Sequence, residues 1–335
     1  MLGLNIFADL ISGTILFAMP LLLVALGGMT SERSGTINIA LEGIMIVGAL
    51  VGCLFLRAVN SSLNGAIPNN PQLIMLGAIL VAAVAGGIFS LLLAFASINL
   101  KADQTIGGTA LNMLAPAFAI VLAWAIQGQG QTTIYIPSWI AIKPENFGLI
   151  ASANPGFWET VIFKSFYLTT PIAIIILIVT TIVYNKTKFG LRLRSCGEHP
   201  QAADSLGINV YKMRYIGVII SGIFAGIGGL AFTVAAGSGF QSDVAGYGFL
   251  GLAVMIFGNW KPLRIFFASL FFALFKTLSG LASSIPFLPD FTGVSNSQYI
   301  YLMLPYIVTM IILALTSKTS RAPKAEGIPY DKGLR

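Results

Sequence analysis

The sequence predicts an all-α, polytopic membrane protein, and three observations support this prediction. Hydrophobic residues make up 56% of the 335 residues, and the mean hydropathy is +0.86. Charged residues make up only 9%. The apolar residues occur in runs of roughly twenty, long enough to cross a bilayer as helices. We therefore expect a helix bundle with about 8 to 10 transmembrane helices.

The apolar runs define the predicted spans in order. The first run has no basic residues before it, so we expect a retained membrane helix rather than a cleaved signal peptide. The run Gly246–Gly258 is short and glycine-rich, which predicts a broken or re-entrant helix buried within protein. The predicted spans are Leu10–Met29, Thr36–Leu56, Leu73–Ile98, Thr105–Ile126, Phe166–Tyr184, Tyr215–Ala235, Gly246–Gly258, Leu263–Ser283 and Tyr299–Leu315.

The basic residues predict the orientation, because cytoplasmic loops carry an excess of lysine and arginine. When the loop after Tyr184 is placed in the cytoplasm, Arg57, Lys143 and Lys164 fall outside. The asymmetry accounts for the net charge of +7 without a nucleic-acid partner. The residues predicted to lie inside are Arg33, Lys101, Lys186, Lys188, Arg192, Arg194, Lys212, Arg214, Lys261, Arg264, Lys318, Arg321, Lys324, Lys332 and Arg335.

These spans divide the chain into a transmembrane domain and a tail. We expect the transmembrane domain to cover residues 1–316, with a cytoplasmic loop at 185–214. Residues 317–335 are expected to form a polar, mobile cytoplasmic tail. The loop Gln127–Trp158, which is rich in proline and aromatic residues, is expected to lie on the outer surface.

The stretch Gly197–Tyr215, "GEHPQAADSLGINVYKMRY", is a polar insert between apolar runs. Pro200 suits a first helical position and Gly207 suits a left-handed helix end, so a helix of about two turns is predicted over Pro200–Leu206. Such a short helix is marginal in water and needs a surface to hold it. Its alanine pair gives it a low profile that the groove of a partner could admit. The alternative is an ordinary basic loop.

The same segment resembles the cytoplasmic coupling loop of ABC-importer permeases of the branched-chain amino acid, ribose and simple-sugar class. In that class a glutamate, an alanine pair and a following glycine contact the ATPase. The stretches "SERSGTINIALEGIMIVGA" and "GFLGLAVMIFGNWKP" also resemble these permeases, in the form of the bacterial nucleoside-uptake branch. The resemblance covers about residues 11–315, except for residues 276–298, where we find no motif. The candidate coupling residues are Gly197, Glu198, Pro200, Ala202, Ala203 and Gly207.

The resemblance implies a permease subunit that carries out no chemistry and binds no cofactor. A separate cytoplasmic ATPase would bind ATP and magnesium. The resemblance further implies an extracytoplasmic substrate-binding protein, a second permease subunit, related or identical, and a location in a bacterial cell membrane. The implied substrate is a nucleoside, and a simple sugar such as ribose is the alternative within the class.

Polar residues inside the predicted spans indicate a candidate translocation path. A carboxylate in a bilayer costs roughly 3 kcal/mol and usually faces a cavity or a partner. Asn38 and Glu42 lie four residues apart and so share one helix face. Gly108 and Asn112 stack in the same way, with Thr109 beside them. Two interpretations stay open: these faces line a path for a neutral polyol or base, or they join helices by hydrogen bonds.

Glycine residues predict close helix contacts. A stripe in the sixth span has the three- to four-residue spacing that permits close crossing. The segments Gly35–Gly48 and Gly246–Gly258 share a glycine-punctuated, apolar character, and one hypothesis makes them counterparts of an internal repeat beside the path. The stripe consists of Gly222, Gly226 and Gly229.

The sequence has no motif for catalysis or ATP binding. It contains no G-x-x-x-x-G-K-[ST] loop, so energy has to come from a partner or an ion gradient. His199 has no second ligand nearby, and Cys53 and Cys196 lie far apart, so we predict neither a metal site nor a disulfide. An ion-coupled transporter, with Glu42 and Lys276 as coupling charges, remains a rival; otherwise Lys276 is expected to snorkel. A membrane-embedded enzyme is disfavoured, because the polar residues are mainly amides and hydroxyls.

Overall fold

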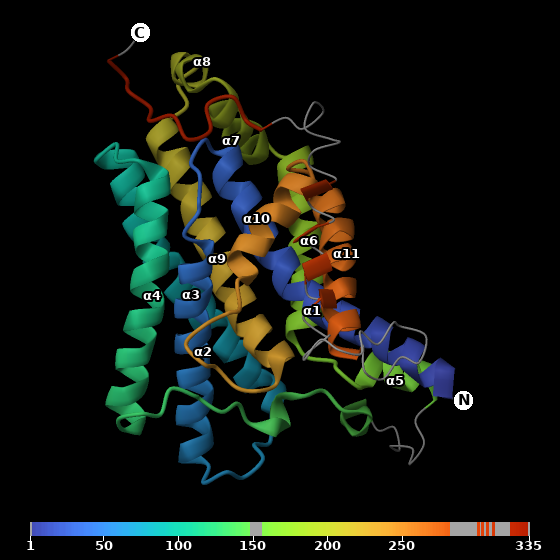
Figure 1. Ribbon diagram of the computed structural model, residues 1–335. Helices are drawn as coiled ribbons and strands as arrows, with labels where there is room; N and C mark the ends of the chain where they lie inside the picture. Colours follow the sequence, from blue (N-terminus) through green and yellow to red (C-terminus); the bar gives the residue numbers. More distant parts are fainter. Residues whose placement is uncertain are drawn as a thin grey trace.

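The computed structural model describes residues 2–147, 156–281, 300–301, 303–304, 306–307, 310–311 and 322–333. The long helices lie side by side in one bundle (Figure 1). The helices are α1 (Leu2–Arg33), α2 (Leu41–Ser62), α3 (Pro71–Ala94), η1 (Phe95–Asn99), α4 (Gln104–Gln127), η2 (Ser138–Ile140), η3 (Pro144–Phe147), α5 (Phe157–Phe163), α6 (Thr169–Lys186), α7 (Lys188–Glu198), α8 (Pro200–Ser205), α9 (Val210–Ala236), α10 (Tyr247–Phe257) and α11 (Pro262–Leu281).

The helix lengths confirm the predicted all-α membrane bundle. Within the described residues, 7 helices are long and apolar enough to cross a membrane: α1, α2, α3 continued by η1, α4, α6, α9 and α11. Helix α10 is shorter, as the run Gly246–Gly258 predicts. Most of the predicted span Tyr299–Leu315 and most of residues 276–298 lie outside the described residues.

The bundle has two distinct ends. Helices α7 and α8 and residues 322–333 lie at one end, at the top of Figure 1, and the connection between α2 and α3 lies at the other. We call these the α8 end and the opposite end. Arg33 contacts Gly197 at the α8 end, and Lys101 pairs with Asp331 there. Residues predicted to be cytoplasmic therefore gather at one end, and the side of the membrane that this end faces stays a prediction.

Helix α9 packs closely against α2 and α3 through its glycine stripe. A Cβ atom on Gly226 would lie 2.3 Å from the carbonyl oxygen of Ala82 in α3. A Cβ atom on Gly229 would lie 2.0 Å from the carbonyl oxygen of Met45 in α2. Small residues let membrane helices approach until their backbones touch, and this contact holds helices together where the lipid is as apolar as the side chains. The packing role predicted for the stripe is confirmed.

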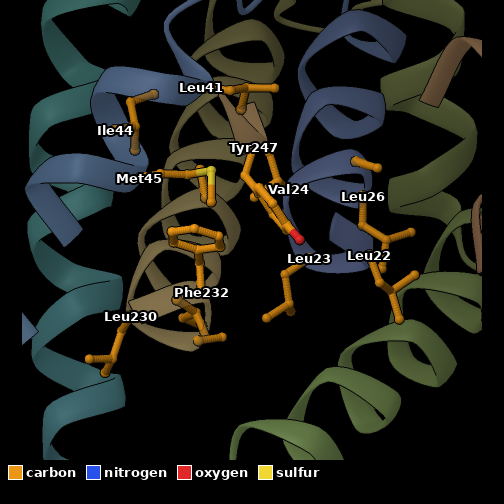
Figure 2. Packing of buried hydrophobic residues seen from close by; sticks show 14 of the residues in the cluster. Leu22, Leu23, Val24, Leu26, Leu41, Ile44, Met45, Leu230, Phe232 and Tyr247 are labelled. Carbon is orange, nitrogen blue, oxygen red and sulfur yellow. The ribbon is translucent and has the colours of Figure 1, made fainter. Parts of the chain in front are cut away.

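Large apolar side chains fill the space between α1, α2, α9 and α10. Figure 2 shows Tyr247 of α10 among Val24, Met45 and Phe232, and the rings of Tyr247 and Phe232 have centroids 4.3 Å apart. Residues 21–26 of α1 have no exposed surface. A helix that is apolar and buried on every side lies in the interior of its bundle. Helix α1 is therefore part of the core.

Helix α4, in contrast, lies at the edge of the bundle (Figure 1). Only 22% of its most apolar window is buried. Exposed side chains such as Ile106, Met113 and Val121 cover its outer side. In a membrane such an apolar face contacts lipid or another subunit.

The predicted outer loop Gln127–Trp158 lies at the opposite end in its described part. Ile134 forms a bridge with Phe240, which joins this loop to the segment before α10. The indole of Trp139 donates to Oδ1 of Asn60 at 3.1 Å. These contacts tie the loop to the end of the bundle.

Candidate functional site

Two helices begin next to each other inside the bundle. Residues 34–40 return from the α8 end as an irregular segment before α2 begins, and residues 237–246 enter from the opposite end before α10 begins (Figure 1). The carboxylate of Glu42, in the first turn of α2, accepts hydrogen bonds from the N–H groups of Gly246 at 2.9 Å and Gly248 at 2.6 Å. We call residues 34–40 and the first turns of α2 and α10 the helix junction.

The helix junction explains how a carboxylate is accommodated at membrane depth. The first N–H groups of a helix have no partner within it and carry partial positive charge. Glu42 lies in the first turn of α2 and faces the first turn of α10, so two helix N-termini stabilise its charge. Hydrogen bonds to an ionised acceptor are stronger than neutral ones. A Cβ atom on Gly248 would lie 2.3 Å from the nitrogen of Glu42, so this close contact requires glycine.

Asn112 of α4 completes the junction from a third helix. Its Oδ1 accepts the N–H of Gly43 at 2.8 Å, and its Nδ2 donates to the carbonyl of Ile39 at 2.8 Å. Gly108, one turn earlier, lies against the same segment, and a Cβ atom there would be 3.0 Å from that of Ile39. Asn112 thus caps the start of α2 from a neighbouring helix.

Asn38 joins the junction to α9. Its Nδ2 donates to Oγ of Ser221 at 2.8 Å, and both side chains are fully buried. Ser221 lies 11 positions after Val210, the first residue of α9, or about 16 Å along the helix. Oδ1 of Asn38, Oγ1 of Thr36 and Nε2 of Gln104 are buried without a hydrogen-bond partner among the described residues. Buried polar groups usually have partners, so these three atoms give the junction spare hydrogen-bonding capacity that is closed to solvent in this structure.

The structure brings together most of the predicted path residues. Thr109 is separate from the rest: it is exposed, and its hydroxyl donates to the carbonyl of Thr105 in its own helix at 2.7 Å. Asn38, Glu42 and Asn112 form hydrogen bonds between elements, and Gly108 allows a close approach to Ile39, as the packing interpretation describes. That they line a path stays a prediction. The residues that meet at the helix junction are Asn38, Glu42, Gly108 and Asn112.

Replacing Asn112 with leucine is expected to lower both thermal stability and transport. Gly43 and Ile39 would each keep a polar backbone group without a partner, at a cost of about 1 to 3 kcal/mol per group. The midpoint of thermal unfolding in detergent, measured beside transport, checks this. Ala110→Leu, an exposed position on the same helix, is the control and should leave the midpoint unchanged. Lost transport at an unchanged midpoint would instead place Asn112 in contact with substrate.

Helices α7 and α8 form the projecting element at the α8 end. Helix α7 packs against the end of α1, where a Cβ atom on Gly197 would lie 2.4 Å from the carbonyl oxygen of Arg33. Pro200 is the first residue of α8, as predicted, and the helix ends at Ser205, one residue earlier than predicted. Gly207 has φ +79°, which confirms the predicted left-handed helix end.

The two faces of α8 differ in exposure. Ala203 is buried against the bundle, and its carbonyl accepts the N–H of Ile208 at 3.1 Å. Ala202 and Glu198 are exposed. Leu206 is 82% exposed at the tip, although sequence reasoning did not select it. The sequence signal that could have identified Leu206 is an apolar residue directly before Gly207, the glycine that ends the helix, within an otherwise polar insert.

A cavity of about 400 Å³ opens beside this element. It lies where α1, α7, the α10–α11 turn and the chain near Pro323 meet. Two guanidinium groups and one carboxylate face it, so its walls carry a positive charge overall. Its lining residues are Arg33, Leu191, Arg194, Ser195, Glu198, Trp260 and Pro323.

Comparison with known proteins identifies the family. Residues 10–313 match the family described as "Branched-chain amino acid transport system / permease component". The chain belongs to this permease family. It is 42% identical over 334 residues to the "Guanosine ABC transporter permease protein NupQ" of Bacillus subtilis (strain 168). This match covers 99% of each of the two chains. The permease is therefore a multi-pass transport protein rather than an enzyme.

Two further relatives come from one organism, Lactococcus lactis subsp. cremoris (strain MG1363). The "Nucleoside ABC transporter permease protein NupC" is 38% identical, with 98% of each chain covered. The "Nucleoside ABC transporter permease protein NupB" is 24% identical, and the match covers 92% of the permease and 83% of NupB. No solved structure gives a significant match.

The permease holds its described C-terminal residues against the bundle, and they do not form the mobile tail that the sequence predicts. We call residues 322–333 the C-terminal strap. The N–H of Ala325 donates to the carbonyl of Gly197 in α7 at 2.8 Å. Nη1 of Arg214, in α9, donates to the carbonyl of Ile328 at 2.8 Å. Ala325 and Tyr330 are buried, so single anchors spaced through a polar segment hold it in place.

The C-terminal strap also carries a carboxyl pair. Glu326 is hydrogen-bonded to the carboxyl of Glu32 in α1, so one of the two must carry a proton. Nε1 of Trp260 donates to the same Glu32 at 2.6 Å. Burial raises the pKa of Glu326 above its usual value. The pair therefore links attachment of the strap to pH.

Attachment of the strap is expected to weaken as pH rises. The pKa of Glu326 is higher in the attached state than its usual value of 4.5. The contribution of Glu326 to the free energy of strap attachment is therefore complete below pH 4.5 and is lost as pH rises through the raised pKa. The mobility of a spin label on Lys332→Cys should therefore increase with pH. Glu326→Gln, which has no carboxyl group to ionise at this position, should reduce this dependence. An identical pH profile in both proteins would contradict the role of Glu326.

Lys276 lies in a second cavity, of about 450 Å³, near the opposite end. It is partly buried five residues before the last residue of α11. Asp9 and Lys164 line the same cavity and pair with each other at 2.5 Å. Among the described residues Lys276 forms no ion pair of its own, and its place near the opposite end of the bundle agrees with snorkelling.

Proposed function

We propose that the permease is the membrane subunit of an ABC importer that moves nucleosides into the cytoplasm. The observation that carries this proposal is the match over 99% of the chain to a guanosine permease at 42% identity. Hydrolysis of ATP in a separate ATPase drives the transport. The α8 end faces the cytoplasm, with the loop 185–214 of the transmembrane domain (residues 1–316) and the tail of residues 317–335 on that side.

The relatives support a nucleoside over a simple sugar. The "Putative glucose ABC transporter permease protein TsgC13" of Haloferax volcanii is 27% identical, against 42% and 38% for the guanosine and nucleoside permeases. The chemistry of the junction fits both classes, because amide and hydroxyl groups hydrogen-bond neutral polar molecules. A sugar such as ribose is therefore the second candidate.

Helix α8 is the proposed docking element for the ATPase. Glu198, Ala202 and Gly207 are exposed and can contact a partner. Gly197 and Ala203 are buried and set the position of α8 on the bundle. Pro200 starts the helix. A short helix on a buried base can transmit movement of a partner to α1 and α7, because these elements touch through backbone atoms at Gly197.

Replacing Leu206 with aspartate is expected to reduce the ATPase recovered with the permease at least tenfold. The leucine is 82% exposed, and a carboxylate at its place would have to lose water on docking. Recovery of the ATPase with tagged permease measures the effect. Ile67→Asp is the control, since Ile67 is 75% exposed in the α2–α3 connection at the opposite end. Full recovery with Leu206→Asp would contradict docking at α8.

The translocation path runs along the helix junction and the open side of α4. Asn38, Glu42, Gly108 and Asn112 lie at the junction, and Thr109 faces outward from α4. The edge position of α4 supports a path that this helix shares with a second permease subunit (Figure 1). Thr109 would then face that subunit.

The second permease subunit is proposed to be a related but different chain. Lactococcus lactis has two nucleoside permeases by name, NupB and NupC, and both match the permease along most of its length. The higher identity to NupC, 38% against 24% for NupB, supports assigning the permease to the NupC side of such a pair. An extracytoplasmic binding protein would deliver the substrate at the opposite end.

Uptake by the complete transporter tests the function. Both permeases, the ATPase and the binding protein are reconstituted in vesicles, and entry of labelled guanosine is measured with ATP. Unlabelled nucleosides should compete, and ribose should not. If ribose competed and the nucleosides did not, the proposed substrate would be a sugar instead of a nucleoside.

A further inference from the structure

The C-terminal strap contacts several parts of the permease that are distant in sequence. Ala325 is bonded to Gly197, the base of the α7–α8 element. Ile328 is bonded to Arg214 of α9. Near its end the strap pairs with the α3–α4 connection, where Lys101 lies 2.6 Å from Asp331. One segment of 12 residues therefore spans most of the α8 end.

The middle of the strap rests on the helix junction. Gly327 has φ +74°, and a Cβ atom there would lie 2.8 Å from Cδ1 of Ile37. The N–H of Ile37 in turn donates to Oε1 of Gln104 in α4 at 2.6 Å. The strap thus covers the segment that leads into α2. Glycine is favoured at this point because of its left-handed backbone angle, and the end of the Ile37 side chain would have to shift to make room for a larger residue.

Arg214 forms a second contact between the strap and the junction. Only 1% of this residue is exposed, and its guanidinium would lie 2.9 Å from a Cβ atom on Gly35. Its one hydrogen bond among the described residues is to the strap carbonyl of Ile328. A buried charge needs its hydrogen-bond partners, so detaching the strap costs free energy as long as Arg214 stays buried.

We propose that the C-terminal strap is a transmission element that links the α8 docking site to the helix junction. It is bonded to α7 at one point and rests on Ile37 and Arg214 two to three residues later. A displacement of α7 and α8 therefore reaches residues 34–40 through the strap as well as through α1. This inference rests on the proposed function, because it assumes that α8 is moved by an ATPase.

The test compares one strap substitution with a matched control in the complete transporter. Gly327→Val strains the left-handed backbone and clashes with Ile37, so it should lift the strap. Gly65→Val places the same side chain at φ +76° in the α2–α3 connection, where no atom lies within 4 Å of a Cβ position. Loss of amide protection at Ala325 reports whether the strap is detached. If the strap stays attached in Gly327→Val, a truncated permease that ends at residue 321 and so lacks the strap is measured in its place.

The measured quantity is the number of guanosine molecules imported per ATP hydrolysed. With the strap detached we expect this ratio to fall at least fivefold, while the ATPase is recovered in full and the unfolding midpoint stays above the assay temperature. Gly65→Val should keep the wild-type ratio. A wild-type ratio with a detached strap would overturn the proposal and leave the strap a stabilising element only. Absence of import by the wild-type transporter would instead reject the proposed function.

Discussion

Replacing Glu42 with glutamine is expected to lower the free energy of unfolding by about 1 to 3 kcal/mol and to reduce transport at least tenfold. Both carboxylate oxygens accept backbone N–H groups, from Gly246 and Gly248. An amide would turn one acceptor into a donor that faces another donor. It would also remove the negative charge that two helix N-termini stabilise.

The thermal unfolding midpoint and guanosine uptake, measured on the same preparation, check this prediction. Glu145→Gln is the control, because Glu145 is exposed in the loop at the opposite end. It should change neither quantity. Wild-type stability in Glu42→Gln would show that the carboxylate does not hold α10 to α2.

Replacing Gly229 with alanine is expected to prevent most of the permease from folding. The new Cβ atom would lie 2.0 Å from the carbonyl oxygen of Met45 and 2.7 Å from its carbon. These are backbone atoms, so no rotamer change relieves the contact and α2 has to move away from α9. Such overpacking in a close helix contact ranks among the most destabilising single changes.

The yield of monodisperse protein after extraction in detergent measures this effect, and we expect a fall of more than tenfold. Gly107→Ala is the matched control: its Cβ atom would lie 3.8 Å from Leu93, an ordinary contact, and alanine favours a helix interior by up to about 1 kcal/mol. The control should fold at least as well as the wild type. Equal yields for the two variants would contradict the close packing of α2 on α9.

The spans and α8 were predictable because their signals are local. Apolar runs of sufficient length and a proline and glycine at the two ends of a short polar helix need no knowledge of the rest of the chain. The glycine stripe of α9 was predictable for the same reason, since small residues at helical spacing indicate close packing.

The helix junction was only partly predictable. Spacing placed Gly108 and Asn112 on one face of α4, and this face does meet the junction. Spacing also placed Asn38 and Glu42 on one helix face, and this was wrong, because α2 begins at Leu41 and Asn38 lies in the irregular segment before it. The partners of Glu42 are backbone N–H groups about 200 residues away, at the start of α10. Backbone donors exist at every helix start, so no side-chain pattern identifies the pair that a distant carboxylate will find.

The C-terminal strap was missed because its composition is polar. Few apolar residues and several charges predict a mobile tail. Its attachment depends on single anchors, such as Ala325 and Tyr330, and on backbone hydrogen bonds to Gly197 and Arg214. Contacts of this kind depend on the shape of the surface beneath and leave no periodic signal in the sequence.

We propose that the permease moves its substrate only when an ATPase acts on α8. Accumulation of guanosine in vesicles, measured for the permeases with and without the ATPase, tests it most directly. We predict accumulation against a gradient only with ATPase and ATP together, and none with Leu206→Asp permease in the same complex. Uphill accumulation by the permeases alone, abolished by a proton ionophore, would contradict the account.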